Sequence, residues 1–275
     1  MMSYTVGWFS TGRDEAAREL LQRVYENIAN GVIPGRISYV FCNRRPGETL
    51  ESDRFIELVK TLDIKVIFLS SSEFEPHLRL ASSQIWRAKY HEEVMSRVQK
   101  YGAETIVLAG YMLIVSPEMC RRHTMINLHP AKPGGPKGTW QQVIWQLIEN
   151  RFHETGAMMH LVTSELDEGP PIAFCTFPIR GEGFDPLWDD LERRLMRKTM
   201  ADVIGEEGEG NPLFMEIRRQ GVRREVPLMV HTLKALAEGR VRVMEGKVLN
   251  EKGEEAGPIL LNDEIERYVR EMELE

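Results

Sequence analysis

The sequence has few of the features that mark secreted, metal-binding or membrane-spanning proteins. Its only cysteines, Cys42, Cys120 and Cys175, are far apart and odd in number, with no CxxC pair or Cys/His cluster, which argues against a disulfide framework and against structural zinc. No apolar run approaches the roughly 20 residues of a membrane span. The first residues lack a basic stretch followed by an apolar one, so no secretory signal is expected. We therefore expect a cytoplasmic protein with no metal site and no membrane contact.

An excess of basic charge is also missing. The chain has 35 Lys and Arg against 42 Asp and Glu, a net charge of −7, so nonspecific attraction to nucleic acid is not expected. Its 275 residues, 42% hydrophobic and 28% charged, match an ordinary globular protein with one large domain or one domain and a small appendage. Small molecules are the expected partners, and a homodimer is compatible with the sequence.

Short β-rich runs alternate with amphipathic stretches in the first 150 residues. The predicted strands are 4–9, 36–42, 65–69, 104–109 and 125–128, and the predicted helices are 14–30, 50–62, 87–101 and 139–150. This alternation predicts an α/β fold with a Rossmann-like, doubly wound, mostly parallel sheet. In such sheets ligands bind at the carboxyl ends of the strands, near a switch in strand order.

The second half of the chain is predicted to extend this sheet and add an appendage. Strands at 156–163 and 171–179 should form an antiparallel extension, followed by helices at 185–204, 212–238 and 262–273. Gly221 and Pro227 are expected to interrupt the second of these helices. Two β-like stretches follow Arg240, with a turn near Gly253. We expect a main domain over 1–204 and a C-terminal helical and β appendage over 205–275, with an insertion near 205–221.

One polar pair stands at the end of a predicted strand. Asn127 and His129 are two residues apart, so both side chains point to the same side of an extended chain. A carboxamide donor beside an imidazole suits the oxyanion of a tetrahedral intermediate. The imidazole needs an orienting partner, and Asp167, in the loop after the next strand, is the candidate. Taken alone, this pair fits a structural tie at a strand end better than a catalytic site.

Three sequence motifs along the chain favour the catalytic interpretation of this pair. They are Val107-Leu108-Ala109-Gly110-Tyr111-Met112-Leu113-Ile114, then Asn127-Leu128-His129-Pro130, then His160-Leu161-Val162-Thr163-Ser164-Glu165-Leu166-Asp167-Glu168-Gly169-Pro170. Together they resemble the folate-dependent formyltransferases, and within that family the branch that formylates glycinamide ribonucleotide. The resemblance covers roughly residues 4–179.

The resemblance implies roles for individual residues. Asn127 would donate to the formyl oxygen, His129 would stabilise the oxyanion, and Asp167 would hold His129 protonated and organise a proton-shuttling water. The co-substrate would be 10-formyltetrahydrofolate, bound in a slot made by two segments and a nearby arginine: Met112, Leu113, Ile114 and Val115; Ser164, Glu165, Leu166 and Glu168; and Arg87. For His160, we favour a structural role within a strand.

The acceptor side departs from the family pattern. Where the family places a phosphate loop after the first strand, this chain has Thr11, Gly12 and Arg13, which could bind a phosphate, followed by two acidic residues that would repel it. Leu113 stands where the purine enzyme has arginine. Lys132, in a Gly/Pro-rich loop over 131–138, could meet an anionic acceptor, although a rigid turn explains that loop as well.

Four functions remain open. The first is formyl transfer to glycinamide ribonucleotide or a related amine. The others are hydrolysis of 10-formyltetrahydrofolate, transfer to an amino sugar nucleotide or a charged initiator tRNA, and folate binding without catalysis. Acidic charge disfavours the tRNA. Binding alone does not need the trio Asn127, His129 and Asp167, which disfavours the noncatalytic alternative.

Overall fold

The computed structural model describes residues 3–272, which form two compact units that the chain enters in turn. Unit 1 comprises the chain up to Leu128 with His160–Pro170 and Thr232–Gly257, and unit 2 comprises His129–Met159, Pro171–His231 and the chain from Pro258. The expected boundary at residue 204 does not coincide with this division, because the residues after 204 contribute to both units.

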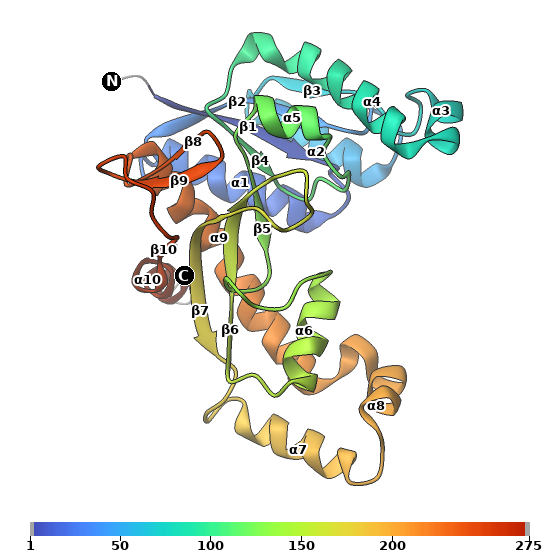
Figure 1. The fold of residues 1–275 in the computed structure, drawn as a ribbon, viewed down its shortest axis with the longest axis vertical. Coiled ribbons are helices and arrows are strands. Elements are labelled where there is room, and N and C mark those ends of the chain that lie inside the picture. Colours follow the sequence, from blue (N-terminus) through green and yellow to red (C-terminus); the bar gives the residue numbers. More distant parts are fainter. Residues whose placement is uncertain (1–2, 273–275) are drawn as a thin grey trace. The chain divides into compact units, whose positions relative to one another are not determined.

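The elements of unit 1 alternate between strands and helices (Figure 1). In chain order they are β1 (Tyr4–Ser10), α1 (Glu15–Ala29), β2 (Gly35–Cys42), α2 (Leu50–Thr61), β3 (Val66–Phe68), α3 (Pro76–Ala81), α4 (Ser83–Val98), the 3₁₀ helix η1 (Gln99–Tyr101), β4 (Thr105–Leu108), α5 (Pro117–Arg122), β8 (Val241–Met244) and β9 (Lys247–Asn250).

The elements of unit 2 are fewer, and three elements run through the boundary. Unit 2 holds α6 (Trp140–Glu149), β7 (Pro171–Pro178), α7 (Asp185–Leu195), α8 (Met200–Glu207), the 3₁₀ helix η2 (Gly208–Gly210), β10 (Ile259–Leu260) and α10 (Asn262–Met272). Elements that begin in one unit and end in the other are β5 (Met125–His129), β6 (Glu154–Leu161) and α9 (Pro212–Ala237).

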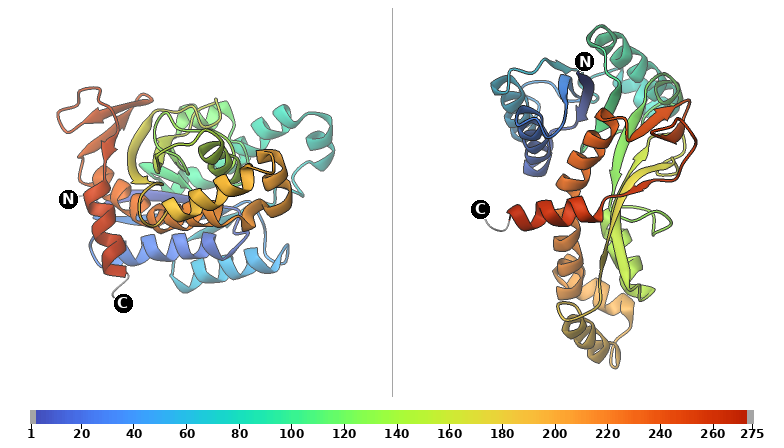
Figure 2. Two further views of the ribbon diagram at one scale, coloured as in Figure 1. Left: turned by 90° about the horizontal axis from the view of Figure 1, so that it is seen from below. Right: turned by 90° about the vertical axis from the view of Figure 1, so that its left-hand side faces the viewer.

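The strands of unit 1 lie in the order β5-β4-β1-β2-β3, and each neighbouring pair is parallel. Helices cover both faces: α1 and α2 lie on one side of the strands, and α4 and α5 on the other (Figure 2). The doubly wound parallel sheet predicted from the sequence is therefore confirmed. Strand order reverses between β1 and β4, which makes the carboxyl ends of these two strands the expected ligand crevice.

Each face of this sheet is sealed by the apolar stripe of a helix. On α1 the residues Ala17, Leu21 and Val24 are buried at spacings of four and three, as the helical period requires. On the opposite face one cluster joins strands to α4 and α5; its members include Phe9, Phe41, Trp86, Tyr90, Val94, Leu108, Tyr111, Met119 and Met125. The first turns are fixed by side-chain caps, Asp14 on α1 and Ser82 on α4.

The strands β6 and β7 form the predicted antiparallel extension. Leu161 N–H donates to Pro170 O (3.0 Å), and Ile179 N–H donates to His153 O (3.0 Å), so residue numbers rise on one strand as they fall on the other. Within unit 2 the order is β10-β7-β6, with β10 parallel to β7. A separate core in this unit packs α6, α7 and α9 around Phe177 and Phe214.

Two expectations about the helices of the second half were wrong. The helix predicted over 185–204 is divided into α7 and α8, because Thr199 and Asp202 form a capping box that starts a new helix. The interruptions expected at Gly221 and Pro227 are absent, since α9 is continuous and the residues after Pro227, from Leu228 to Val230, are fully buried. Burial there outweighs the intrinsic helix-breaking tendency.

The predicted turn near Gly253 is confirmed, since Gly253 has φ of 82° and Leu249 and Glu255 pair antiparallel across it. A turn that was not predicted precedes it: Glu245 and Gly246 connect β8 to β9 with φ of 52° and 75°, the positive values that a two-residue hairpin turn requires. The last helix ends at Met272 as far as the structure describes it, and the predicted end at Glu273 lies outside the described residues. Within residues 3–272, no helix is long and apolar enough to cross a membrane.

The core of unit 1 contains one fully buried histidine, His91 on α4. Burial lowers its pKa to about 4. Its ionisable neighbours are Tyr111, which stays neutral in acid, and Arg87, which stays charged. His91 is therefore neutral at pH 7.

This burial predicts an acid-dependent loss of stability. In the unfolded chain His91 titrates near its ordinary value of about 6.5, so between pH 6.5 and pH 4 the unfolded state binds more protons. The free energy of unfolding should then fall with pH through this window, by up to roughly 3 kcal/mol from this group. Urea unfolding of wild type and His91→Gln at pH 7 and pH 4.5 measures the difference, and an equal loss in both proteins would contradict the expectation.

Candidate active site

The loops after β1 and β4 meet at the reversal of strand order. Thr11 N–H donates to Gly110 O (3.1 Å), and Met112 N–H donates to Thr11 Oγ1 (2.9 Å). Two hydrogen bonds therefore join the segment predicted to bind an acceptor to the segment predicted to bind folate. Since both bonds involve backbone N–H groups, they fix the path of the two loops at the carboxyl edge of the sheet.

The loop after β1 is closed tightly onto α2 and capped by its own carboxylate. Gly12 has φ of 58°, and a Cβ there would lie 2.8 Å from Phe55 Cβ, so glycine is required. Asp14 Oδ1 accepts from Ala17 N (3.0 Å) at the start of α1. Arg13 is exposed and donates to Asp14 Oδ2 and to the sulfur of Met112. The positive end of α1 thus already holds a carboxylate.

The segment Met112–Val115 crosses the carboxyl end of β4 without helical or strand structure. Met112 and Ile114 are 52% and 46% exposed, while Val115 is buried and Leu113 packs against the apolar cluster. Exposed apolar side chains at the carboxyl edge of the sheet suit a flat, apolar ligand. Arg87, the predicted tail-binding arginine, lies on α4 and is half-buried.

Strand β5 carries both members of the predicted polar pair. Asn127 pairs in register with Leu108 of β4 and, by the alternation of the strand, shares a face with Met125, the face covered by α4 and α5. Asn127 is half-buried. His129, the first residue of unit 2, is 3% exposed, and its Nε2 lies 3.2 Å from Pro136 O.

The loop between β6 and β7 folds back on itself, so that Asp167 lies near the end of β6. Gly169 approaches so closely that a Cβ would lie 1.8 Å from Leu161 O. Thr163 Oγ1 donates to Glu165 O (3.0 Å), and Asp167 itself has φ of 55°, in the left-handed region that aspartate tolerates better than most residues. Of the predicted folate residues here, Ser164, Glu165, Leu166 and Glu168 are all exposed.

The result is a polar cluster of three side chains in unit 1. His160 Nε2 lies 3.5 Å from Asn127 Nδ2 and 3.7 Å from Asp167 Oδ1. The other ring nitrogen, Nδ1, lies 2.9 Å from Leu161 O, which can only accept, so Nδ1 carries a proton. A neutral His160 accepts from the Asn127 amide at Nε2, and a protonated one forms an ion pair with Asp167.

His160 lies within a strand, as the sequence predicted, but its meeting with Asn127 and Asp167 was not predicted. It was expected to be structural, yet it stands between two of the three predicted catalytic residues. The available signal was its place on a strand neighbouring β5, two residues before the loop that carries Asp167. The expected pairing of Asp167 with His129 stays a prediction, since these residues belong to different units.

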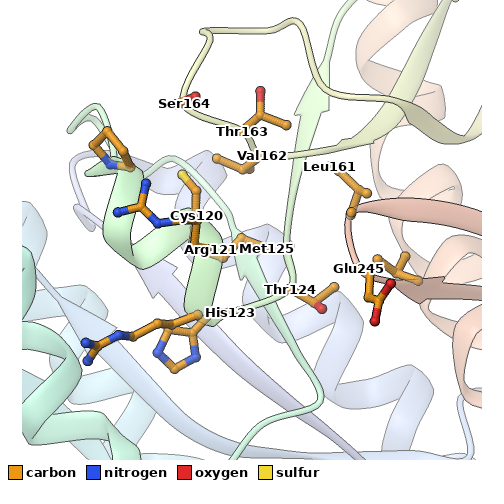
Figure 3. Close-up of a pocket in the computed structure, with 14 residues that line it drawn as sticks. Cys120, Arg121, His123, Thr124, Met125, Leu161, Val162, Thr163, Ser164 and Glu245 are labelled. Atoms are coloured by element: carbon orange, nitrogen blue, oxygen red, sulfur yellow. The ribbon is translucent and has the colours of Figure 1, made fainter.

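A cavity of about 430 Å³ lies within unit 1 beside these segments. Its walls come from the end of α5, the start of β5, the end of β6 and the β8–β9 turn, and Cys120, Met125 and Val162 give it an apolar side (Figure 3). Burial raises the pKa of the Cys120 thiol, which is therefore neutral. Arg121 and Glu245 add charge to the lining. The size is that of a small-molecule site.

Lys132, the remaining predicted acceptor residue, lies in unit 2. Its Nζ forms an ion pair with Glu154 Oε1 at 2.6 Å, and both side chains are partly exposed. No cluster of three or more His, Cys, Asp or Glu side chains suited to a metal occurs between residues 3 and 272.

Comparison with known proteins gives one consistent match. The sequence profile of the family described as formyl transferase matches residues 20–197. Phosphoribosylglycinamide formyltransferase of Schizosaccharomyces pombe is 30% identical over 168 residues, 58% of this chain and 77% of that protein.

Solved structures agree on the fold. The phosphoribosylglycinamide formyltransferase of Coxiella burnetii is 18% identical with a TM-score of 0.65, covering 94% of this chain and 99% of its own. A formyltetrahydrofolate deformylase of Pseudomonas syringae is 21% identical with a TM-score of 0.58, covering 91% and 66%. At these identities the similarity concerns the fold alone.

Closure of the Asp167 loop can be tested at Gly169. Gly169→Ala should lower the free energy of unfolding by roughly 1–3 kcal/mol, because the added methyl group meets a backbone carbonyl that cannot move independently of β6. Gly257→Ala is the matched control in the same unit, since no atom lies within 4 Å of its added Cβ. Denaturant unfolding of both variants measures the effect, and equal stabilities would contradict the close approach.

Proposed function

The chain belongs to the formyl transferase family, and from this premise we propose that it moves a formyl group from 10-formyltetrahydrofolate to an amine, with glycinamide ribonucleotide the first candidate acceptor. The observation that carries the proposal is the cluster of Asn127, His160 and Asp167 beside the strand-order reversal. An amide donor, an imidazole and a carboxylate are the groups that a formyl transfer uses.

The reaction exchanges one C–N bond for another. The amine nitrogen attacks the formyl carbon, the carbonyl oxygen becomes an oxyanion, and the bond from that carbon to N10 of the folate then breaks. One proton leaves the amine and one reaches N10, so the products are the formamide and tetrahydrofolate.

Each predicted catalytic residue has one task in this sequence. Asn127 donates an amide N–H to the oxyanion, and His160 orients that amide by accepting its other N–H. His129 supplies the second stabilising group, as the family motif implies. Asp167 receives the proton of the attacking amine through a water molecule and passes it toward N10.

The folate carrier would bind between the segments Met112–Val115 and Ser164–Glu168. The cavity beside Cys120, Met125 and Val162 supports this placement, since its walls continue directly into both segments: α5 follows Val115, and Thr163 precedes Ser164. Its apolar side suits one face of the bicyclic ring, and exposed backbone groups of the two segments suit the ring's polar edge. Arg87 is the candidate partner of the carrier's carboxylate tail.

The transfer predicts amine-dependent release of tetrahydrofolate. Asn127→Ala and His129→Ala should each lower kcat by roughly a hundredfold or more, because each removes a group that stabilises the oxyanion. His77→Ala, an exposed histidine on α3, is the control and should retain normal turnover. Release of tetrahydrofolate without amine would instead identify a hydrolase, and near-normal rates in both variants would reject the site.

The nature of the acceptor can be tested at Asp14. If the phosphate of the acceptor binds at the start of α1, Asp14→Asn should lower the KM of glycinamide ribonucleotide by roughly two- to fivefold. The helix end then loses a charge that repels the phosphate, while asparagine caps the helix equally well. The KM of an acceptor amine without phosphate should not change. No change for glycinamide ribonucleotide, measured by the same release assay, would place its phosphate away from α1.

A further inference from the structure

The segment Met112–Val115 cannot fix its own conformation. It has no helical or strand hydrogen-bonding pattern, and two of its four side chains are about half exposed. Apart from the bond from Met112 N–H to Thr11 Oγ1, the backbone of the segment must therefore be held by what lies at its two ends. These ends are Tyr111, whose ring is buried in the apolar cluster, and Ser116, which caps α5 by accepting from Met119 N.

One imidazole touches both ends of the segment. His91 Nε2 lies 3.2 Å from Tyr111 Oη, and His91 Nδ1 lies 3.2 Å from the backbone N of Ser116. All three residues are buried, so neither bond competes with water. His91 belongs to α4, which is held to the sheet by Trp86, Tyr90 and Val94, so the ties run from a rigid element to an irregular one.

The hydrogen-bonding capacity of the ring sets the direction of each bond. The Ser116 N–H can only donate, so Nδ1 accepts and the ring proton sits on Nε2, which donates to Tyr111 Oη. Nδ1 also lies 3.0 Å from Arg87 O, but a proton on Nδ1 would set two donors, Nδ1–H and the Ser116 N–H, against each other at 3.2 Å. The arrangement needs a neutral ring, in agreement with the burial of His91.

We propose that His91 is a positioning residue for the folate-binding segment, holding Met112–Val115 in its binding conformation through Tyr111 and Ser116. This inference rests on the proposed function, because it assumes that the segment meets the carrier. His91 touches no substrate. Without its two bonds the segment would occupy several conformations, and binding the carrier would have to order it again.

The consequence is a specific kinetic signature. His91→Phe removes both bonds while keeping a ring in the core. It should raise the KM and Kd of 10-formyltetrahydrofolate roughly tenfold for each residue of Met112–Val115 that loses its fixed backbone conformation. The kcat at saturating carrier and the KM of the amine should stay within about twofold, because the ring nitrogens of His91 bond to Tyr111, Ser116 and Arg87, none of which is a predicted catalytic residue. A residue that served only packing would not separate these constants.

Conservative variants divide the two ties. His91→Asn places an amide oxygen near the position of Nδ1 and retains the bond from Ser116, and Tyr111→Phe removes only the bond at the other end. Both should weaken carrier binding less than His91→Phe. Val98→Ala is the control, since Val98 lies two helical turns along α4 in the same cluster and its side chain has no hydrogen-bonding group. It should lower Tm and leave the KM of the carrier unchanged.

Calorimetry with 10-formyltetrahydrofolate and amide hydrogen exchange together decide the outcome. The inference predicts faster exchange at Met112–Val115 in His91→Phe than in Val98→Ala at matched stability, with the loss of carrier affinity described above. Unchanged exchange and unchanged Kd in His91→Phe would overturn it. If the wild type bound no carrier, the proposed function would fail, and exchange at the segment would still show whether His91 holds it.

Discussion

The hydrogen bonds that Thr11 exchanges with the loop after β4 hold the part of unit 1 on which the candidate site depends. They form because β1 and β4 are neighbouring parallel strands, so that their carboxyl ends lie side by side before the two loops turn to opposite faces of the sheet. With Gly110 and Met112 fixed in this way, the chain must pass through Met112–Val115 to reach α5. The position of α5 then determines one wall of the cavity beside Cys120.

Buried polar side chains of unit 1 also hold these loops in place. His91 and His160 are both almost completely buried, and each finds partners for its two ring nitrogens. An unpaired nitrogen in either place would cost about 1–3 kcal/mol, so each ring accepts few orientations. One consequence is that the loops at the carboxyl edge are tied to specific atoms of α4 and β6. Apolar packing alone would leave those loops freer to shift.

Much of the fold could be predicted from the sequence, because short β-rich apolar runs alternate with amphipathic stretches of helical period along unit 1. His91 also carried a readable signal: its spacings of three, four and seven to Val94, Met95 and Val98 put it on the apolar face of α4. The meeting of His160 with Asp167 had only a weak signal, the place of His160 two residues before the loop, because the contact itself depends on a left-handed backbone at Asp167 and on the close approach at Gly169. The continuity of α9 through Pro227 likewise depends on burial that no local pattern reveals.

The acceptor side is governed by how firmly its charges are already held. Lys132 and Glu154 are both partly exposed, and an ion pair of that kind contributes at most about 1 kcal/mol, so an anion could separate them at little expense. Asp14 is different, because its carboxylate is bonded to the first turn of α1 and cannot leave without uncapping the helix. This fixed negative charge would repel a phosphate that approaches α1, whereas it would not repel an uncharged acceptor. If the acceptor binds at these residues, as we propose, its choice depends more on the carboxylate that caps α1 than on Lys132.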